Sequence, residues 1–262
     1  MRSIDVEIPP KIDNNLSPEP PGTGYIPLWK RVLDVTCILI SLPVTLPVFL
    51  LVALWIKIVS AGPAFFKQER VGFKGNRFTL FKFRTMKRNV GTDLHEKHVA
   101  GLAEADVPMT KLDVIGDPRI IPGGKILRAL GIDELPQIFN VLRGEMSLVG
   151  PRPCLPCEWE KLRANQRARY NTVPGLTGYW QVNGKNRTTF ARMIELDIFY
   201  TKHLSLSLDL WIMLKTVPAI LSQVGAKRKR AKSGGKPLVP FVSIRPEAED
   251  LGSLVGSPER EF

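Results

Sequence analysis

Two adjacent acids, Asp133 and Glu134, are the residues whose placement most favours chemistry. Apolar side chains recur at i, i+3, i+4 and i+7 across 135–142, which predicts a helix with one buried face that begins near the two acids. Pro136 is tolerated only in a first turn, and Gly144 is a natural stop. Both carboxylates would therefore stand at the positive end of a helix dipole, where negative charge is favoured.

An aspartate before a helix is usually an N-cap, so only its surroundings favour a chemical role. Arg128 precedes the pair, and Arg152 lies between two prolines whose fixed φ angles would hold its guanidinium in place. Arginine binds phosphate oxygens in a bidentate manner, and a carboxylate among cations can hold Mg²⁺ or act as a nucleophile. Successive helical residues point about 100° apart, so we expect Asp133 and Glu134 to divide the roles. One would attack or bind metal, and the other would orient.

A long apolar run precedes these groups and indicates a membrane segment. From Val35 to Ile56 the chain carries no charged residue, and about 20 apolar residues suffice to cross a bilayer as a helix. Pro43 and Pro47 lie near the middle of the run, and each removes a backbone donor. The sequence therefore predicts a sharp bend inside the membrane segment.

Basic residues flank the apolar run on both sides, with Lys30 and Arg31 before it and Lys57 after it. The positive-inside rule would keep both ends in the cytoplasm, which favours a re-entrant hairpin over residues 32–57. An ordinary spanning helix with a proline kink is the alternative that the residues leave open.

Two further segments favour a surface that meets phosphate or membrane. Residues 64–86 predict a β-hairpin, and the stretch 67–88 carries eight Lys or Arg residues against one acid, with phenylalanines between them. Such a surface can bind phosphates, lie on a membrane or stack on single-stranded nucleic acid, and the neighbouring apolar run favours the first two. Lys82 and Arg84 are its candidate substrate-binding residues. Residues 155–170 predict a basic amphipathic helix in the membrane interface.

The last part of the body offers polar candidates of lower specificity. Residues 173–190 are rich in turn formers, and Gln181 and Arg187 could contact a nucleotide or be ordinary loop groups. Residues 189–222 predict one or two helices, with Asp197 set among apolar neighbours.

Composition limits the partners and the compartment. The chain has 37 Lys and Arg residues against 25 acids, a net charge of +12, so an anionic partner is expected: phospholipid, a phosphorylated substrate or nucleic acid. Its three cysteines indicate no disulfide framework, which fits a reducing cytosol. We expect a disordered leader over 1–28, one catalytic domain over 29–224 and a disordered basic tail over 225–262.

Six motifs follow one another in order between residues 29 and 222, and together they resemble the bacterial sugar transferase family. These are the monotopic polyprenyl-phosphate hexose-1-phosphate transferases that initiate exopolysaccharide, O-antigen or glycoprotein glycan synthesis. Each motif is weak alone, whereas the ordered set is specific. They read KRVLDV, FFKQERVGFKGNRFTLFKFRTM, DPRI, ILRALGIDELPQIFNVLRGEMSLVGPRP, PGLTGYWQVNGKNR and LDIFYTKHLSLSLDLWIMLKTVPAIL.

The resemblance implies an Asp-Glu catalytic dyad, with Asp133 as nucleophile and metal ligand, Glu134 as its partner and Mg²⁺ as cofactor. The aspartate would attack the sugar-bearing phosphorus of a UDP-sugar and expel UMP. A polyprenyl (undecaprenyl) phosphate would then displace the aspartate. The enzyme would work at the cytoplasmic face of a bacterial inner membrane, and the sugar is not identified.

By motif position, Pro47 carries over as the main helix breaker, and Arg128, Arg152 and Asp197 carry over as active-site residues. Some members of the family have Ser directly before that proline, where this chain has Leu46. The detail of the bend is therefore open.

The expected fold is a mostly helical α+β body with a re-entrant amino-terminal helix-break-helix, a small β-hairpin and interfacial amphipathic helices. We expect no nucleic-acid partner, and a homodimer is compatible with the sequence. Two other functions compete: a basic membrane-anchored docking protein without catalysis, and an enzyme that transfers the sugar alone and releases UDP.

Overall fold

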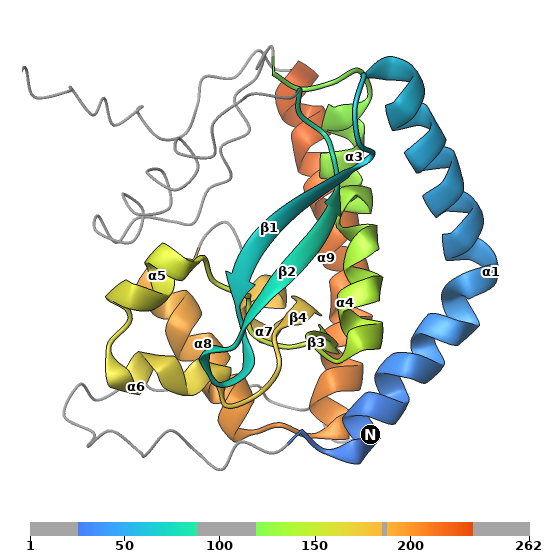
Figure 1. The fold of residues 1–262 in the computed structure, drawn as a ribbon. Helices are drawn as coiled ribbons and strands as arrows, with labels where there is room; N and C mark the ends of the chain where they lie inside the picture. Colours follow the sequence, from blue (N-terminus) through green and yellow to red (C-terminus); the bar gives the residue numbers. More distant parts are fainter. Residues whose placement is uncertain (1–25, 88–118, 185–187, 233–262) are drawn as a thin grey trace, which may run out of the picture. The chain divides into compact units, whose positions relative to one another are not determined.

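The computed structural model describes residues 26–87, 119–184 and 188–232, and Figure 1 shows their arrangement. The described part is mostly helical with a small hairpin, as the sequence predicts, and it also contains a second two-stranded sheet that the sequence analysis does not predict. Its elements are α1 Leu28–Val59, β1 Phe65–Val71, η1 Phe73–Gly75, β2 Arg77–Phe83, α3 Gly124–Leu130, η2 Ile132–Gln137, α4 Ile138–Arg143, β3 Ser147–Val149, α5 Pro156–Lys161, α6 Ala164–Arg167, η3 Ala168–Tyr170, β4 Gly175–Thr177, α7 Tyr179–Val182, α8 Phe190–Lys202 and α9 Leu206–Lys232.

The apolar run forms one helix, α1, whose 32 residues include both prolines. Figure 1 shows α1 bowed along its length, which agrees with a bend at Pro43 and Pro47. The helix continues through both prolines, so the break that the sequence predicts is a bend within one helix. The Ser41 hydroxyl donates to the carbonyl of Ile38, 2.9 Å away, just before the bend. The re-entrant path remains a proposal.

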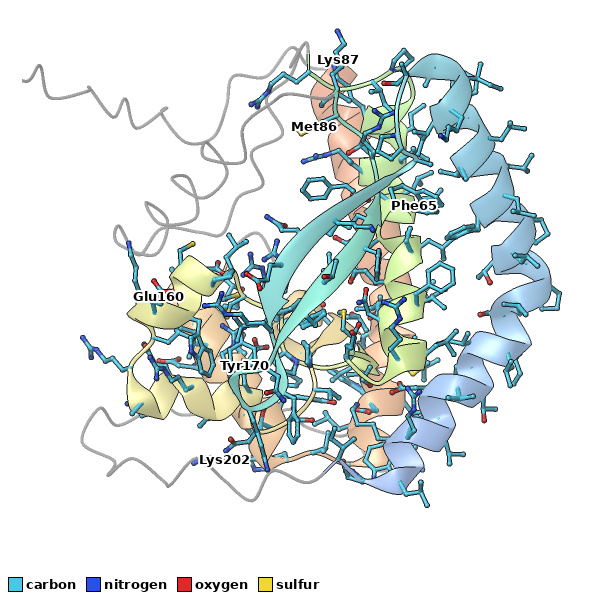
Figure 2. The ribbon with its side chains drawn as sticks, viewed as in Figure 1. Phe65, Met86, Lys87, Glu160, Tyr170 and Lys202 are labelled. Carbon is cyan, nitrogen blue, oxygen red and sulfur yellow. The ribbon has the colours of Figure 1, made fainter. Side chains whose placement is uncertain are left out.

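Most of the apolar surface of α1 is uncovered by protein. Its only buried residues are Lys30, Asp34, Ile38 and Ile56. Figure 2 shows side chains projecting from α1 away from the rest of the protein along much of its length. By length and composition, α1 is the one candidate for a membrane-crossing helix among the described residues. This helix therefore needs lipid or another apolar partner to cover it.

The predicted β-hairpin is confirmed. Strands β1 and β2 pair in antiparallel register from Phe65 opposite Phe83 to Val71 opposite Arg77. At the α1 end of the hairpin, the rings of Phe65 and Phe83 lie 5.7 and 4.9 Å from the ring of Phe49 (Phe65 is labelled in Figure 2). This aromatic cluster packs the second half of α1 against the hairpin.

The helix predicted after the two acids is real but differs in its start and its buried face. The acids lie in a 3₁₀ turn, η2, and the α-helix begins only at Ile138; Gly144 ends it with φ of 80°, as predicted. The expected burial of the whole 135–142 stripe is wrong, because Phe139 and Leu142 expose 46% and 40% of their surface. Within α4 the buried residues are instead Asn140 and Val141, and the ring of Phe139 lies 5.6 Å from the ring of Phe49 of α1.

The single amphipathic helix predicted over 155–170 is also corrected. The segment forms α5, α6 and η3, and a new turn starts at Arg163, whose N–H donates to the Gln166 side chain at 2.9 Å. Leu162 is buried, and Trp159 packs against the same apolar core, so this apolar face meets protein. Interfacial placement of this segment is therefore not needed to cover it.

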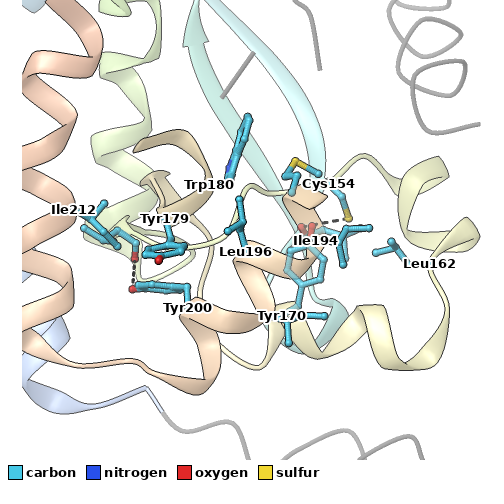
Figure 3. Close-up of a cluster of buried hydrophobic side chains, with 13 residues drawn as sticks. Cys154, Leu162, Tyr170, Tyr179, Trp180, Ile194, Leu196, Tyr200 and Ile212 are labelled. Carbon is cyan, nitrogen blue, oxygen red and sulfur yellow. Dashed lines mark hydrogen bonds between the residues drawn. The ribbon is translucent and has the colours of Figure 1, made fainter. Parts of the chain in front are cut away.

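The main apolar core lies between the two sheets and the last helices. It includes residues of α8 and α9 together with Tyr170 and Tyr179. Figure 3 shows Tyr179 beside Tyr200 of α8 on one side of Leu196, and Tyr170 near Ile194 on the other side. Two helices fill 189–222 as predicted, and α9 continues to Lys232, past the start of the predicted tail. Residues 1–25 of the predicted leader and 233–262 of the tail lie outside the described residues.

Candidate active site

The η2 turn, which carries the two acids, packs against strand β2. Asp133 is buried, with 9% of its surface exposed, whereas the side chain of Glu134 is one-third exposed. Lys82 of β2 forms an ion pair with Glu134, with Nζ 3.1 Å from Oε1. The structure therefore brings together three predicted site residues from segments that lie about 50 residues apart in sequence.

Asn140, which the sequence analysis did not single out, docks the dyad segment on the hairpin. Its side-chain amide donates to the carbonyl of Thr79 at 2.7 Å and accepts from the N–H of Phe81 at 3.2 Å. This pairing imitates a neighbouring strand at the edge of β2. The amide also donates to Glu145 at 2.6 Å, and Asn140 is fully buried. Because Lys82 follows Phe81, Asn140 fixes the position of α4 and η2 relative to Lys82.

A signal for Asn140 exists in the sequence. It is a single amide within the apolar run IFNVL, where an unpaired polar group would cost roughly 1–3 kcal/mol. Its importance follows only from its partners, which come from another element.

Arg84, a predicted substrate-binding residue, caps the C-terminal end of α1. Its guanidinium donates to the carbonyls of Ser60 and Ala61, each 2.7 Å away. Cations are favoured at helix C-termini, where carbonyls lack intrahelical partners. The structure thus gives Arg84, which directly follows β2, a role in holding the end of α1 to the hairpin.

Arg152 lies in a turn whose main chain is held on both sides. Its N–H donates to Asp197 at 3.3 Å, and its carbonyl accepts from the Tyr170 hydroxyl at 2.9 Å and from Arg169 at 3.3 Å. Asp197 is wholly buried and forms an ion pair with Arg169. The predicted site residue Asp197 therefore acts beneath the turn, through the backbone of Arg152.

The Arg152 guanidinium is paired with Glu158, at 3.0 and 3.1 Å from the two carboxylate oxygens. Burial alone would raise the pKa of Glu158, but Arg152 and Arg70 outweigh it and hold the pKa below its usual value. For Asp197 the effect of burial is larger than that of the neighbouring charge, so burial raises its pKa to about 6 although Arg169 lowers it. A phosphate that binds Arg152 would share this guanidinium with Glu158.

A small sheet positions the same turn. Strand β3 leads directly into it and pairs in parallel with β4. A Cβ built on Gly175 would stand 2.0 Å from the backbone nitrogen of Gly150, so only glycine permits this approach. Arg152 is thus presented on a close-packed support.

The other predicted residues are spread over neighbouring elements. Arg128 lies in the last turn of α3, which packs against η2 and is separated from it by Gly131. Gln181 is partly exposed in α7, the helix that follows β4 in the chain. Arg187 lies outside the described residues.

Lys30, predicted as a flanking charge of the membrane segment, is completely buried at the start of α1. Its ammonium lies 2.6 Å from Asp209, 3.0 Å from the Tyr200 hydroxyl and 2.7 Å from the carbonyl of Val149. Tyr200 in turn donates to Asp209 at 2.7 Å. Because Val149 is next to the turn that carries Arg152, the first turn of α1 is connected directly to the candidate site.

A Mg²⁺ site would have to be built from few side chains. Among the described residues, no three His, Cys, Asp or Glu side chains come together. Mg²⁺ at phosphoryl-transfer sites is typically held by one or two carboxylates, with substrate phosphates and waters completing the shell. The buried carboxylate of Asp133 therefore fits a metal site of this kind, whereas Glu134 of the same turn is paired with Lys82.

Known proteins are similar to this chain over the same stretch that contains the motifs. Residues 25–223 match a family model described as bacterial sugar transferase. The chain is 38% identical over 197 residues to the exopolysaccharide production protein ExoY of Sinorhizobium fredii, covering 75% of this chain and 87% of that protein. It is 42% identical over 206 residues to the UDP-glucose:undecaprenyl-phosphate glucose-1-phosphate transferase of Caulobacter vibrioides, covering 75% and 71%.

Some similar proteins are much longer. The undecaprenyl-phosphate galactose phosphotransferase of Salmonella typhimurium is 36% identical over 221 residues, which are 82% of this chain but 44% of that protein. The matched region is therefore most of the shorter relatives and less than half of the longer ones.

Proposed function

The chain belongs to the bacterial sugar transferase family, and from this premise we propose that it transfers a sugar 1-phosphate from a UDP-sugar to polyprenyl phosphate and releases UMP. Relatives named as undecaprenyl-phosphate sugar phosphotransferases support this reaction class. In that role the chain would be a phosphoglycosyl transferase for the first step of exopolysaccharide or glycoconjugate assembly.

The observation that carries the proposal is the dyad beside Lys82, on a body attached to an apolar helix that protein leaves largely uncovered. Asp133 is held in η2, and the positively charged ammonium of Lys82 lies beside the carboxylate of Glu134. Phosphoryl transfer is catalysed mainly by positioning and by neutralising charge. The uncovered side of α1 would keep this site close to the headgroups, where a lipid phosphate can reach it.

We propose two displacements at phosphorus. In the first, an Asp133 carboxylate oxygen attacks the sugar-bearing β-phosphorus, and the bond from that phosphorus to the UMP oxygen breaks. In the second, a phosphate oxygen of the acceptor attacks the same phosphorus, and the bond to Asp133 breaks. The products are UMP, polyprenyl diphosphate sugar and the original carboxylate, so atoms and charge balance.

The remaining residues bind and orient. Asp133 would hold Mg²⁺, which would supply charge neutralisation at the diphosphate. Arg152 would bind a phosphate oxygen from its supported turn, and Glu134, paired with Lys82, would orient the nucleophile. Arg128 and Gln181 are proposed to contact substrate.

The re-entrant path of α1 is also proposed, at the cytoplasmic face of the inner membrane. One end of α1 is anchored by Lys30, and the other by Arg84 and by Trp55, whose indole N–H donates to the carbonyl of Pro122 at 3.2 Å. Both ends therefore contact the same body. A body on one side of a bilayer can hold both ends of a bent helix more readily than the ends of a straight span.

The test is UMP release from a panel of UDP-sugars by purified protein with Mg²⁺ and polyprenyl phosphate. Asp133→Asn should lower lipid-dependent UMP release on the order of a thousandfold or more, because the nucleophile is lost. Glu160→Gln, which changes an exposed acid on α5, should leave it unchanged.

The products separate the competing functions. UDP release would identify a transferase that moves the sugar alone. A fully active Asp133→Asn variant, or no nucleotide product from any donor, would contradict the proposed mechanism and favour a docking protein.

A further inference from the structure

A hollow of about 260 Å³ lies between the bend of α1 and the segment that carries the dyad. We propose that it binds the isoprene units of the acceptor lipid nearest the phosphate, an inference that rests on the proposed function. Its walls are formed by Val44, Thr45 and Val48 on one side and by Leu130, Ile132 and Leu135 on the other, with Gly131 between them.

The first wall belongs to the part of α1 that protein leaves uncovered. Val44, Thr45 and Val48 surround the second proline of α1, and Val44 exposes 71% of its surface. The neighbouring outward residues Leu46 and Leu50 expose 48% and 58%. An apolar chain moving within the membrane can therefore enter the hollow sideways, without crossing a polar surface.

The second wall would guide the hydrocarbon chain of the lipid to the two acids. Ile132 and Leu135 directly flank Asp133 and Glu134 in sequence and belong to the same 3₁₀ turn. An apolar chain seated on these two side chains would place its phosphate end beside the dyad. The space beside Gly131 is open to the lipid, since a Cβ built on this residue meets no atom within 4 Å.

The lining and the size select the kind of ligand. Thr45 carries the one polar side chain among the lining residues, so a sugar or a nucleotide would lose hydrogen bonds there. The volume is below the roughly 300–1,000 Å³ of sites that enclose a whole small molecule. The hollow therefore suits a short section of a long hydrocarbon chain whose remainder stays in the bilayer.

Filling the hollow tests the proposal. Val48→Trp places a large ring in it, whereas Leu51→Trp adds the same ring on the lipid-facing side of α1, where Leu51 is 67% exposed. Lipid-dependent UMP release is measured while polyprenyl phosphate and UDP-sugar are varied separately. Val48→Trp should raise the KM for the lipid about tenfold and leave the KM for the donor unchanged. Leu51→Trp should change neither.

A second measurement covers the case in which Val48→Trp fails to fold. A photoreactive benzoylphenylalanine at position 45 should crosslink to radiolabelled polyprenyl phosphate, and excess unlabelled lipid should suppress the crosslink. The same group at position 51 should give a crosslink that excess lipid does not suppress.

Three results would overturn the inference: equal effects of the two tryptophans, a parallel rise in the donor KM, or capture of bulk phospholipid alone at position 45. A wild-type protein that releases no UMP with any lipid would instead refute the proposed function itself.

Discussion

The positions of several buried charged side chains in this protein are set by the oppositely charged groups next to them. Glu158 illustrates the point, because its carboxylate binds Arg152 and also accepts from the N–H of Leu155 at 2.6 Å. Removing one partner of a buried ion pair typically costs about 3–5 kcal/mol, since the other charge is left uncompensated. Glu158 thus supports both the fold and the guanidinium that we expect to meet phosphate.

The depressed pKa of Glu158 predicts a pH dependence. A carboxylate with a lowered folded-state pKa stabilises the protein above its unfolded pKa, about 4.5, and this stability is lost as the pH falls through the folded value. Glu158→Gln should lower the Tm at pH 7 by roughly 6–12 °C, corresponding to about 3 kcal/mol. The difference from wild type should shrink as the pH is lowered below about 4.5.

Thermal unfolding in detergent across pH 3.5–8 checks this prediction. Glu160→Gln, on the same short helix but exposed, should show no such trend. A Tm difference for Glu158→Gln that stays constant over this pH range would contradict the assigned ion pair.

At the scale of elements, the dyad depends on how α4 meets the hairpin. The short η2 and α4 could not hold a fixed position alone, because isolated helices of this length are unstable. Asn140 supplies the connection, and it does so with hydrogen bonds to main-chain atoms at the edge of β2. The geometry between Glu134 and Lys82 follows from this contact.

Asn140→Leu should therefore impair both stability and catalysis. The substitution keeps the volume but leaves the N–H of Phe81 and the carbonyl of Thr79 without their partner, at a cost of about 3 kcal/mol. We expect faster hydrogen exchange at the Phe81 amide and a larger loss in kcat than in donor binding.

Exchange mass spectrometry and steady-state kinetics give these readouts. Asn76→Leu, in the exposed turn of the hairpin, serves as the control and should change neither quantity. Unchanged exchange at Phe81 in Asn140→Leu would show that the side chain does not hold this edge.

At the scale of the whole described body, α1 is fastened at both ends and uncovered in between. Lys30 and Asp209 connect its start to α9, and Arg84 connects its end to β2. The exposed apolar residues between these contacts are the surface that lipid would cover.

The proposed re-entrant path predicts that both ends of α1 face the same compartment. Single cysteines replacing Leu28 and Ile58, which are 71% and 70% exposed, are introduced after removal of the three native cysteines. Both should react with a membrane-impermeant maleimide in inside-out vesicles and neither in intact spheroplasts. Reaction of the two cysteines from opposite sides would establish a spanning helix.

Much of the candidate site could be predicted from the sequence because its signals are local. Asp133 and Glu134 were identified by their place before an apolar run among cations, and the structure brings Lys82 to Glu134. The positions of Arg84 and Asp197 could not be predicted, since each is defined by contact with a distant main chain. The buried face of α4 could not be predicted, because Asn140 is buried through its hydrogen bonds to β2, which an apolar period does not show.

The sequence by itself determined the long apolar helix, the hairpin and the order of motifs, because hydropathy, alternation and turn residues act over short distances. Only the tertiary structure decided which charges are structural. Lys30 and Asp209 are 179 residues apart in sequence and 2.6 Å apart in space. No local pattern encodes such a pair, since the function of a buried charge depends on the groups that folding places around it.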